Sequence, residues 1–187
     1  MIKKIGNYPA NHDLAIQRCI QIAQYIKFIV DYEKKHSVRL DRERGDIKLF
    51  LWAFTCDAPD IPGYDAVKYS ECHHPHSLQA ASLIKEARSR SRRKIKGLRH
   101  EHVIPLSKLR QMLFDNPATS CGNYITVSKF LSDFLHVAVI TRDEALKLDR
   151  SFRTQMPNDW SPGDDPYLRY TRVGIDLIQP MEAMYNT

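Results

Sequence analysis

Apolar residues recur at steps of three and four along the first half of the chain, which is the spacing of one helix face. This spacing predicts a helix over residues 12–35 and another over 77–93, with Ser77 as N-cap of the second. Between them we expect a dense charged turn over 39–46 and a short apolar helix over 47–54. The first half of the chain is therefore predicted to be mainly helical.

The second half carries strand signals as well. The β-branched pair Val103-Ile104 stands before a proline, which favours an extended segment over 98–104. Residues 136–141 give the clearest strand, and Thr141 then caps a helix over 142–152. Further amphipathic stretches predict helices over 106–114, 126–135 and 166–177. The order of strand, helical insert, strand and helix indicates an α+β fold.

Composition narrows the class of protein. The chain has 187 residues, 43% of them hydrophobic and 27% charged, which suits one globular domain with or without a helical appendage. No apolar run approaches the roughly 20 residues of a membrane span. The N-terminal residues lack the long apolar core of a signal peptide. We therefore expect a cytoplasmic protein without a membrane partner.

Positive charge is concentrated in one window. The whole chain has a formal net charge of +6, whereas residues 85–99 alone carry eight basic residues against Glu86, or 8 − 1 = +7. Such a run suits a polyanion, because each phosphate that is neutralised releases counterions. The alternative is a solvated basic helix face. The residues that we expect to contact nucleic acid are Arg88, Arg90, Arg92, Arg93, Lys94, Lys96, Arg99 and, in the tail, Arg169.

The four cysteines form no Cys-x-x-Cys pair, so we expect free core thiols rather than disulfides. One cluster, Cys72-His73-His74-Pro75-His76, has metal-ligand chemistry. It lacks a second ligand pair at zinc-finger spacing, and a polar loop rich in histidine is the simpler interpretation.

The segment His100-Glu101-His102 follows the basic window directly. Hydrolysis of a phosphodiester needs a base that activates water and a cation that stabilises the charged transition state. Imidazole suits the first task at neutral pH, and a carboxylate suits a hard divalent ion. The sequence thus places base, carboxylate and basic residues within a short stretch.

The string Glu101-His102-Val103-Ile104-Pro105 resembles the first motif of the HNH, or ββα-metal, nuclease superfamily. The strand at 136–141 and the helix at 142–152 are similar to the second strand and the helix of that core. The tail, with Met156-Pro157-Asn158-Asp159-Trp160, Asp164-Asp165-Pro166, Arg169-Tyr170 and Gly174-Ile175, is similar to that of small bacterial and phage HNH-like proteins. The resemblance covers residues 95–176.

The resemblance implies N-terminal helices packed on an HNH-like core with a helical insert between its two strands. It implies a mainly helical accessory region over 1–94, and the core with its C-terminal tail over 95–187.

The resemblance also implies roles for individual residues. His102 would be the general base, and Glu101 a ligand of Mg²⁺, Mn²⁺, Ni²⁺ or Zn²⁺. Strand alternation opposes a shared site for these neighbours, and would instead put His100 on the face of His102 as a further metal ligand. The position expected for the helix ligand holds Ala145, so Asp149, one turn later, is the substitute. The family's middle asparagine is assigned to Asn123, a catalytic residue, rather than to Asn116.

Three functions follow from these residues. The first is a metal-dependent endonuclease acting on double-stranded DNA. The second is a metal-free ribonuclease, because the spacing of Arg93 and His100 resembles the signature of helical HEPN ribonucleases. The third is a nucleic-acid-binding protein with a degenerate nuclease core. Homodimerisation is left open.

Overall fold

The computed structural model describes residues 12–56, 74–89 and 95–178 of the chain. Helices and a small mixed four-stranded sheet make up this part, which confirms the predicted α+β class. Among the described helices, none combines the length and the apolar character that crossing a lipid bilayer requires.

The chain divides into two compact units, each built from two separate stretches. The helical unit comprises Met1–Asp57 and Pro105–His136, and the sheet unit comprises Ala58–Ile104 and Val137–Thr187. The expected boundary between residues 94 and 95 thus falls inside the sheet unit, because 74–89 contributes a strand and a helix to the sheet layers. The helical insert belongs to the other unit.

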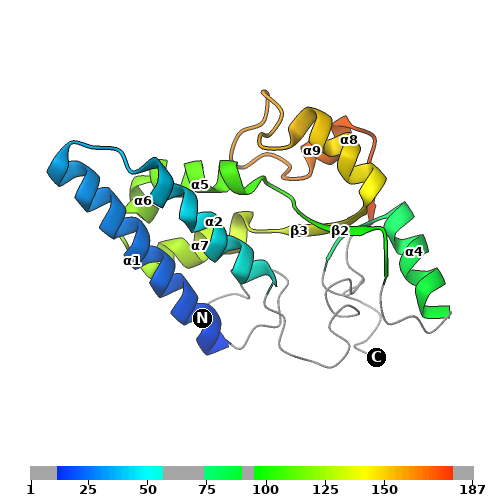
Figure 1. The fold of residues 1–187 in the computed structure, drawn as a ribbon, viewed down its shortest axis with the longest axis horizontal. Coiled ribbons are helices and arrows are strands. Elements are labelled where there is room, and N and C mark those ends of the chain that lie inside the picture. The colour runs from blue at the N-terminus through cyan, green and yellow to red at the C-terminus, as the bar shows by residue number, and fades with distance from the viewer. Residues whose placement is uncertain (1–11, 57–73, 90–94, 179–187) are drawn as a thin grey trace. The chain divides into compact units, whose positions relative to one another are not determined.

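The described helices of the helical unit are α1 (His12–His36), α2 (Asp41–Cys56), α5 (Leu106–Asp115), α6 (Pro117–Ser120) and α7 (Tyr124–Phe134). Helix α1 runs alongside α2 and α7 (Figure 1). It buries an apolar stripe of Cys19, Ile22, Ala23, Ile26, Ile29 and Val30. The predicted helices over 12–35, 106–114 and 126–135 are confirmed. Gly122, at φ 79°, is required before α7, because a Cβ there would lie 2.7 Å from Cβ of Lys27.

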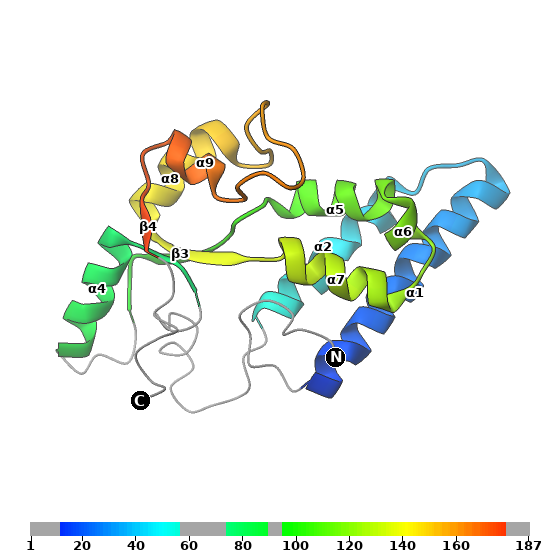
Figure 2. The ribbon, with the colours of Figure 1, turned by 180° about the vertical axis from the view of Figure 1, so that it is seen from behind.

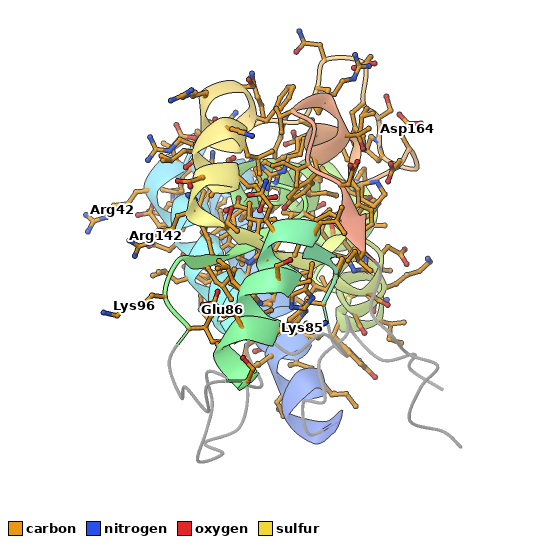
Figure 3. All side chains as sticks on the ribbon, turned by 90° about the vertical axis from the view of Figure 1, so that its right-hand side faces the viewer. Arg42, Lys85, Glu86, Lys96, Arg142 and Asp164 are labelled. Atoms are coloured by element: carbon orange, nitrogen blue, oxygen red, sulfur yellow. The ribbon has the colours of Figure 1, made fainter. Side chains whose placement is uncertain are left out.

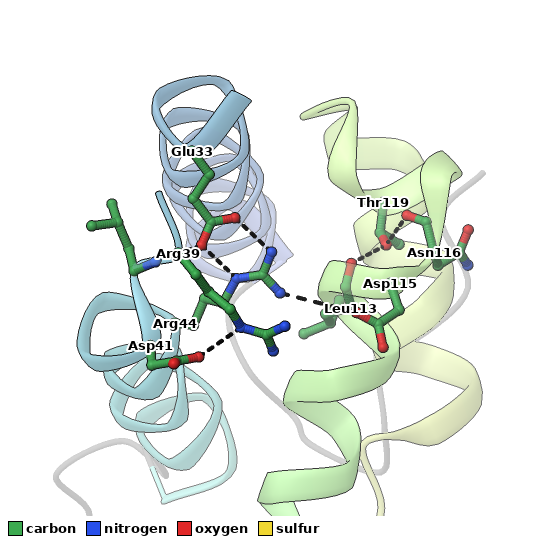
Figure 4. A network of polar contacts seen from close by, with 9 residues as sticks. Glu33, Arg39, Asp41, Arg44, Leu113, Asp115, Asn116 and Thr119 are labelled. Atoms are coloured by element: carbon green, nitrogen blue, oxygen red, sulfur yellow. Dashed lines mark hydrogen bonds and ion pairs between the residues drawn. The ribbon is translucent and has the colours of Figure 1, made fainter. Parts of the chain in front are cut away.

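The predicted turn over 39–46 is wrong beyond residue 40, because α2 begins at Asp41 and runs through the charged stretch. One of these charged residues, Arg44, pairs with neighbouring helices (Figure 4). Arg44 donates two hydrogen bonds to the Glu33 carboxylate of α1, at 2.8 and 2.6 Å, and its guanidinium lies 4.7 Å from the ring centre of Phe114 in α5. Both side chains of the ion pair are mostly buried, at 16% and 11% exposed. Arg44 is therefore packed between α1 and α5 as part of a helix, and its main partner, Glu33, lies outside the predicted turn.

The sheet unit contains strands β1 (His76–Ser77), β2 (Leu98–His102), β3 (Val137–Thr141) and β4 (Leu177–Ile178), in the order β2-β3-β1-β4. Strand β3 pairs antiparallel with β2 and parallel with β1, and β1 pairs antiparallel with β4. The predicted strands at 98–104 and 136–141 are confirmed with slightly shorter bounds. The tail helix predicted over 166–177 is only the five residues of α9 (Leu168–Arg172), and β4 follows it.

Helices cover both faces of this sheet, α4 (Leu78–Ser89) on one side and α8 (Arg142–Phe152) with α9 on the other (Figures 1 and 2). Alternation along β3 explains the two layers. Ala138 and Ile140 pack with Ala145, Leu148 and Tyr170 in one core cluster. Val139 points the other way and packs with Leu98, Ala80 and Ile84 in a second cluster.

Helix starts in the sheet unit follow the predicted caps. Thr141 and Glu144 form a capping box at α8, with Thr141 N donating to Glu144 Oε2 at 2.8 Å. The Ser77 hydroxyl caps α4 by accepting from Ala80 N at 3.1 Å, and it donates to the same carboxylate oxygen of Glu144 at 2.6 Å. The buried Glu144 thus ties the start of α4 to the start of α8.

The cysteine prediction is confirmed in part. Cys19 is a buried free thiol whose pKa burial raises to about 11. Cys121 is also free but exposed, which differs from a core position. The side chain of Cys56, together with Cys72 and His73, lies outside the described residues. His74 and His76 of the Cys72-His73-His74-Pro75-His76 cluster are described and buried, at 3% exposed each.

Candidate functional site

Strand β2 separates the candidate residues onto two faces of the sheet. Glu101 pairs in register with Ala138, whose side chain packs toward α8, whereas His100 pairs with Val139, which packs toward α4. Residues opposite one another in a ladder share a face, so Arg99 and Glu101 lie on the α8 side and His100 and His102 on the α4 side. The alternation anticipated from sequence therefore holds, and the predicted base and the predicted metal ligand are directed to opposite faces.

On the α8 side, Arg99 bridges two of the three predicted metal ligands, Glu101 and Asp149. Its Nε lies 2.9 Å from Oε2 of Glu101, and its Nη1 donates to Oδ2 of Asp149 at 2.7 Å. The structure thus brings Glu101 and Asp149 together, as the resemblance implied, but with a guanidinium between them. The Arg99 side chain is 42% exposed, so this bridge lies at the surface end of the cluster.

Arg169 of α9 holds Glu101 from the inner side. Its side chain is fully buried, and it donates to Oε1 of Glu101 at 2.9 Å, to Val103 O at 2.8 Å and to Phe152 O at 2.9 Å. A further bond goes to the carbonyl of His102. Because every donor group of this arginine is directed to the protein interior, its position corrects the expectation that Arg169 contacts nucleic acid.

The residues present do not fit a divalent metal. Two guanidinium groups engage both carboxylate oxygens of Glu101, Arg99 at Oε2 and Arg169 at Oε1, and Arg99 also binds Oδ2 of Asp149. The third position expected from the resemblance, Ala145, is buried in the core and has no donor atom. Within the described residues no group of three or more His, Cys, Asp or Glu side chains is placed to hold a metal ion. The acidic pair is therefore a closed ion-pair cluster.

His102, the predicted general base, is only partly accessible. Burial, with a smaller contribution from the nearby Arg169 charge, lowers its pKa from 6.5 to about 4. The imidazole is therefore neutral at pH 7, as a general base must be, but it is a weak base.

His100 stands against the His74 ring at 5.0 Å between centroids, in an edge-to-face arrangement. It lies in strand β2, whereas the HEPN-like alternative needs this residue on a helix, and Arg93 lies outside the described residues.

Asn123, the predicted catalytic asparagine, belongs to the helical unit. Its side-chain oxygen accepts a hydrogen bond from Ile125 N at 2.9 Å and so caps α7. Asn116 has the same role at α6, where it accepts from Ala118 N. Both asparagines therefore have a local structural function as helix caps, and neither lies in the unit that holds His102.

Part of the basic window can be located. Lys85 on α4 and Lys96 before β2 are exposed, as a phosphate contact requires. Arg99 is engaged by the two carboxylates. The side chain of Arg88, together with Arg90, Arg92, Arg93 and Lys94, lies outside the described residues.

Two features of the site were not predicted from the sequence. Arg99 and Arg169 act as partners of the acidic pair, and Arg169 is separated from Glu101 by 68 residues, so no local pattern reports the contact. The outer face of α8 carries further cations, Arg142, Lys147 and Arg150, all exposed. Their spacing along a predicted helix, with Arg142 and Arg150 about two turns apart, was a signal that could have been used.

Comparison of the chain with protein-family models gives no match, and neither curated proteins nor solved structures give one.

Proposed function

We propose that this protein binds nucleic acid, with duplex DNA as its partner, and that the site around Glu101 is structural rather than catalytic. The observation that carries the proposal is the Arg99 bridge between Glu101 and Asp149. A carboxylate pair closed by a guanidinium stabilises the packing of β2 on α8 but offers no open position for a cation or a phosphate.

The charge distribution supports the nucleic-acid part of the proposal. The chain has a net charge of +6, and the window over 85–99 carries more than that total. Two lysines of the window, Lys85 and Lys96, lie in the described part of the chain and form no ion pair with a carboxylate there. Both are exposed. Backbone phosphates are the partner that such a surface attracts irrespective of base sequence.

A metal-dependent endonuclease is the second candidate, because one observation favours it. Strand β3, which pairs antiparallel with β2, is followed directly by α8, and Arg99 links Glu101 of β2 to Asp149 of α8. This order supports the likeness to the HNH core. In this function Arg99 would have to leave the carboxylates. The end of β2 would also have to turn, so that His102, which is directed to the other face, reaches the attacking water and accepts its proton.

One experiment separates the two functions. The full chain is mixed with supercoiled plasmid in EDTA, Mg²⁺, Mn²⁺ or Ni²⁺, and binding and nicking are read from the same samples. The proposed function predicts a complex that weakens as salt rises and no nicking in any buffer. Nicking that needs metal and disappears in His102→Ala would overturn it in favour of the endonuclease. The absence of any complex would overturn both.

A further inference from the structure

The outer face of α8 is a row of cations. The helix buries Glu144, Ala145 and Leu148 against the sheet and leaves Arg142, Lys147 and Arg150 exposed. Arg153 at the C-cap continues the row and is exposed as well. Positions 142, 146, 150 and 153 follow the three- and four-residue spacing of one helix face and span about 16 Å at 1.5 Å per residue. Arg142, Arg150 and Arg153 are the cations of this face, Leu146 stands between them, and Lys147 lies beside it.

These cations have no carboxylate partner among the described residues at ion-pair distance. The acid at the start of the row is Asp143, and Asp149, on the inner edge of α8, is bonded to Arg99. Four positive charges on this face therefore oppose one negative charge. The other described arginines of the sheet unit are all paired with carboxylates, unlike the cations of this row. They are Arg99, Arg169 and Arg172.

Lys96 extends the row at its N-terminal end. The backbone N of Arg142 donates to Gly97 O at 2.8 Å, which fixes the turn that carries Lys96 beside the start of α8. Figure 3 shows Lys96 and Arg142 projecting on the same side, whereas Asp164 lies on the opposite side. Asp164 and Asp165 are both exposed in the loop before α9. Lys96 and Arg142 thus project on the side of the sheet unit opposite to Asp164.

We propose that the outer face of α8, extended by Lys96, is the surface on which backbone phosphates of duplex DNA bind. The inference rests on the proposed nucleic-acid function and names its surface. The row of about 16 Å matches nearly five base-pair steps of about 3.4 Å. Arginine suits this partner because its planar donors bind phosphate in a bidentate manner.

Another polyanionic surface, an anionic membrane, fits this face less well. An interfacial helix needs a broad apolar face that enters the lipid, and Leu146 is the apolar residue that α8 exposes. Charge complementarity without an apolar face favours the phosphate backbone of nucleic acid.

The test uses the full chain with Arg142, Arg150 and Arg153 each replaced by Gln. Affinity for a short fluorescent duplex is measured by anisotropy from about 50 to 200 mM salt. The slope of log affinity against log salt should become shallower by about 2.7, because each arginine that no longer neutralises a phosphate reduces it by roughly 0.9. The single variant Arg150→Gln should lower the slope by about 0.9. The backbone bond to Gly97 is unaffected by these changes, and circular dichroism checks that the fold is intact.

The control replaces three exposed cations elsewhere, Lys35, Lys129 and Arg172, by Gln, and so removes the same net charge. The inference is supported if the slope of log affinity against log salt becomes shallower in the α8 variant and stays at the wild-type value in the control. Equal slopes in both variants would overturn the assignment to α8 while leaving nucleic-acid binding in place. No binding by the wild type would overturn the proposed function and the inference together.

Discussion

The buried guanidinium of Arg169 donates to the carboxylate of Glu101 at 2.9 Å, across 68 residues of sequence. This contact joins α9 to β2, and the same arginine binds the carbonyls at the end of β2 and of α8. A single side chain of α9 thereby satisfies acceptors on two other elements of the sheet unit, at the end of β2 and at the end of α8. The position of Glu101, which the sequence assigned to a metal, is set by this arginine and by Arg99.

Replacement of Arg169 by Met should destabilise the sheet unit strongly. The methionine leaves the Glu101 carboxylate, only 11% exposed, with one of its two cationic partners missing, and it leaves three carbonyls without this donor. Loss of one partner from a buried ion pair costs about 3–5 kcal/mol. Urea unfolding of the full chain measures the change. Arg172→Met is the control, because its ion pair with Asp159 is exposed and should contribute less than about 1 kcal/mol. Equal effects of the two substitutions would contradict the assigned role.

Tyr170→Phe should leave stability unchanged or raise it by about 1 kcal/mol. The Tyr170 hydroxyl is buried and, among the described residues, is the side-chain polar atom without a hydrogen-bond partner. Burial also raises its pKa, so it stays protonated. Removing an unsatisfied buried hydroxyl removes its desolvation cost and keeps the ring packing with Ala145 and Leu148. Thermal unfolding of the variant tests this, and a loss of stability would show that the hydroxyl has a partner.

Arg99→Gln should make the protein sensitive to divalent cations. Without the guanidinium, Glu101 and Asp149 face one another with less positive charge between them, so Mn²⁺ gains a place to bind. At a concentration about ten times its Kd, a bound ion would stabilise the variant by about 1.4 kcal/mol. The measurement is the unfolding midpoint with Mn²⁺ and with EDTA, and the wild type should show no difference between them. A wild type that Mn²⁺ stabilises as much as the variant would contradict the finding that the acidic pair is closed.

In the helical unit, Arg44→Met should cost about 2 kcal/mol or more, since it leaves the mostly buried Glu33 unpaired. The ion pair also lowers the pKa of Glu33, which shows that the charged form of this carboxyl is favoured in the fold. The matched control is Arg39→Met, whose partner Asp41 is exposed, and its effect should be small. Urea unfolding followed by helical circular dichroism compares the two variants.

Local signals were sufficient for much of this fold. Thr141 and Glu144 carry the capping box within four residues, and α8 begins where that pattern places it. The strand ending in Thr141 was equally clear because all five of its residues are apolar or β-branched. A helix or strand whose determining residues all lie within one short stretch of sequence could therefore be predicted.

Non-local partners explain the errors. Strand β1 has two residues, too few for any periodicity, and it forms because β3 and β4 pair with it. The charged start of α2 resembled a turn because the partner of Arg44, Glu33, stands on the preceding helix. The arginine partner of Glu101 was missed for the same reason, since the residues around Glu101 in the sequence contain no sign of Arg169 in α9. The spacing of residues in the sequence identified Glu101 and Asp149 as neighbours, but it did not show that the guanidinium of Arg99 lies between them.

The last prediction concerns the pH dependence of stability, which should include a contribution from His102. Burial lowers the pKa of this residue to about 4 in the folded chain, against 6.5 when it is exposed. As pH falls from about 6.5 towards 4, the unfolded chain takes up a proton that the folded chain does not, so stability is lost across this window. The contribution is fully present above about pH 6.5, and the loss is at most about 1.4 kcal/mol per pH unit. Urea unfolding at several pH values between about 5 and 7 measures the slope. His102→Gln should flatten it, whereas His36→Gln, at the exposed end of α1, should not. If the slope in His102→Gln stays as steep as in the wild type, another group is responsible and His102 is more accessible to protons than its surroundings indicate.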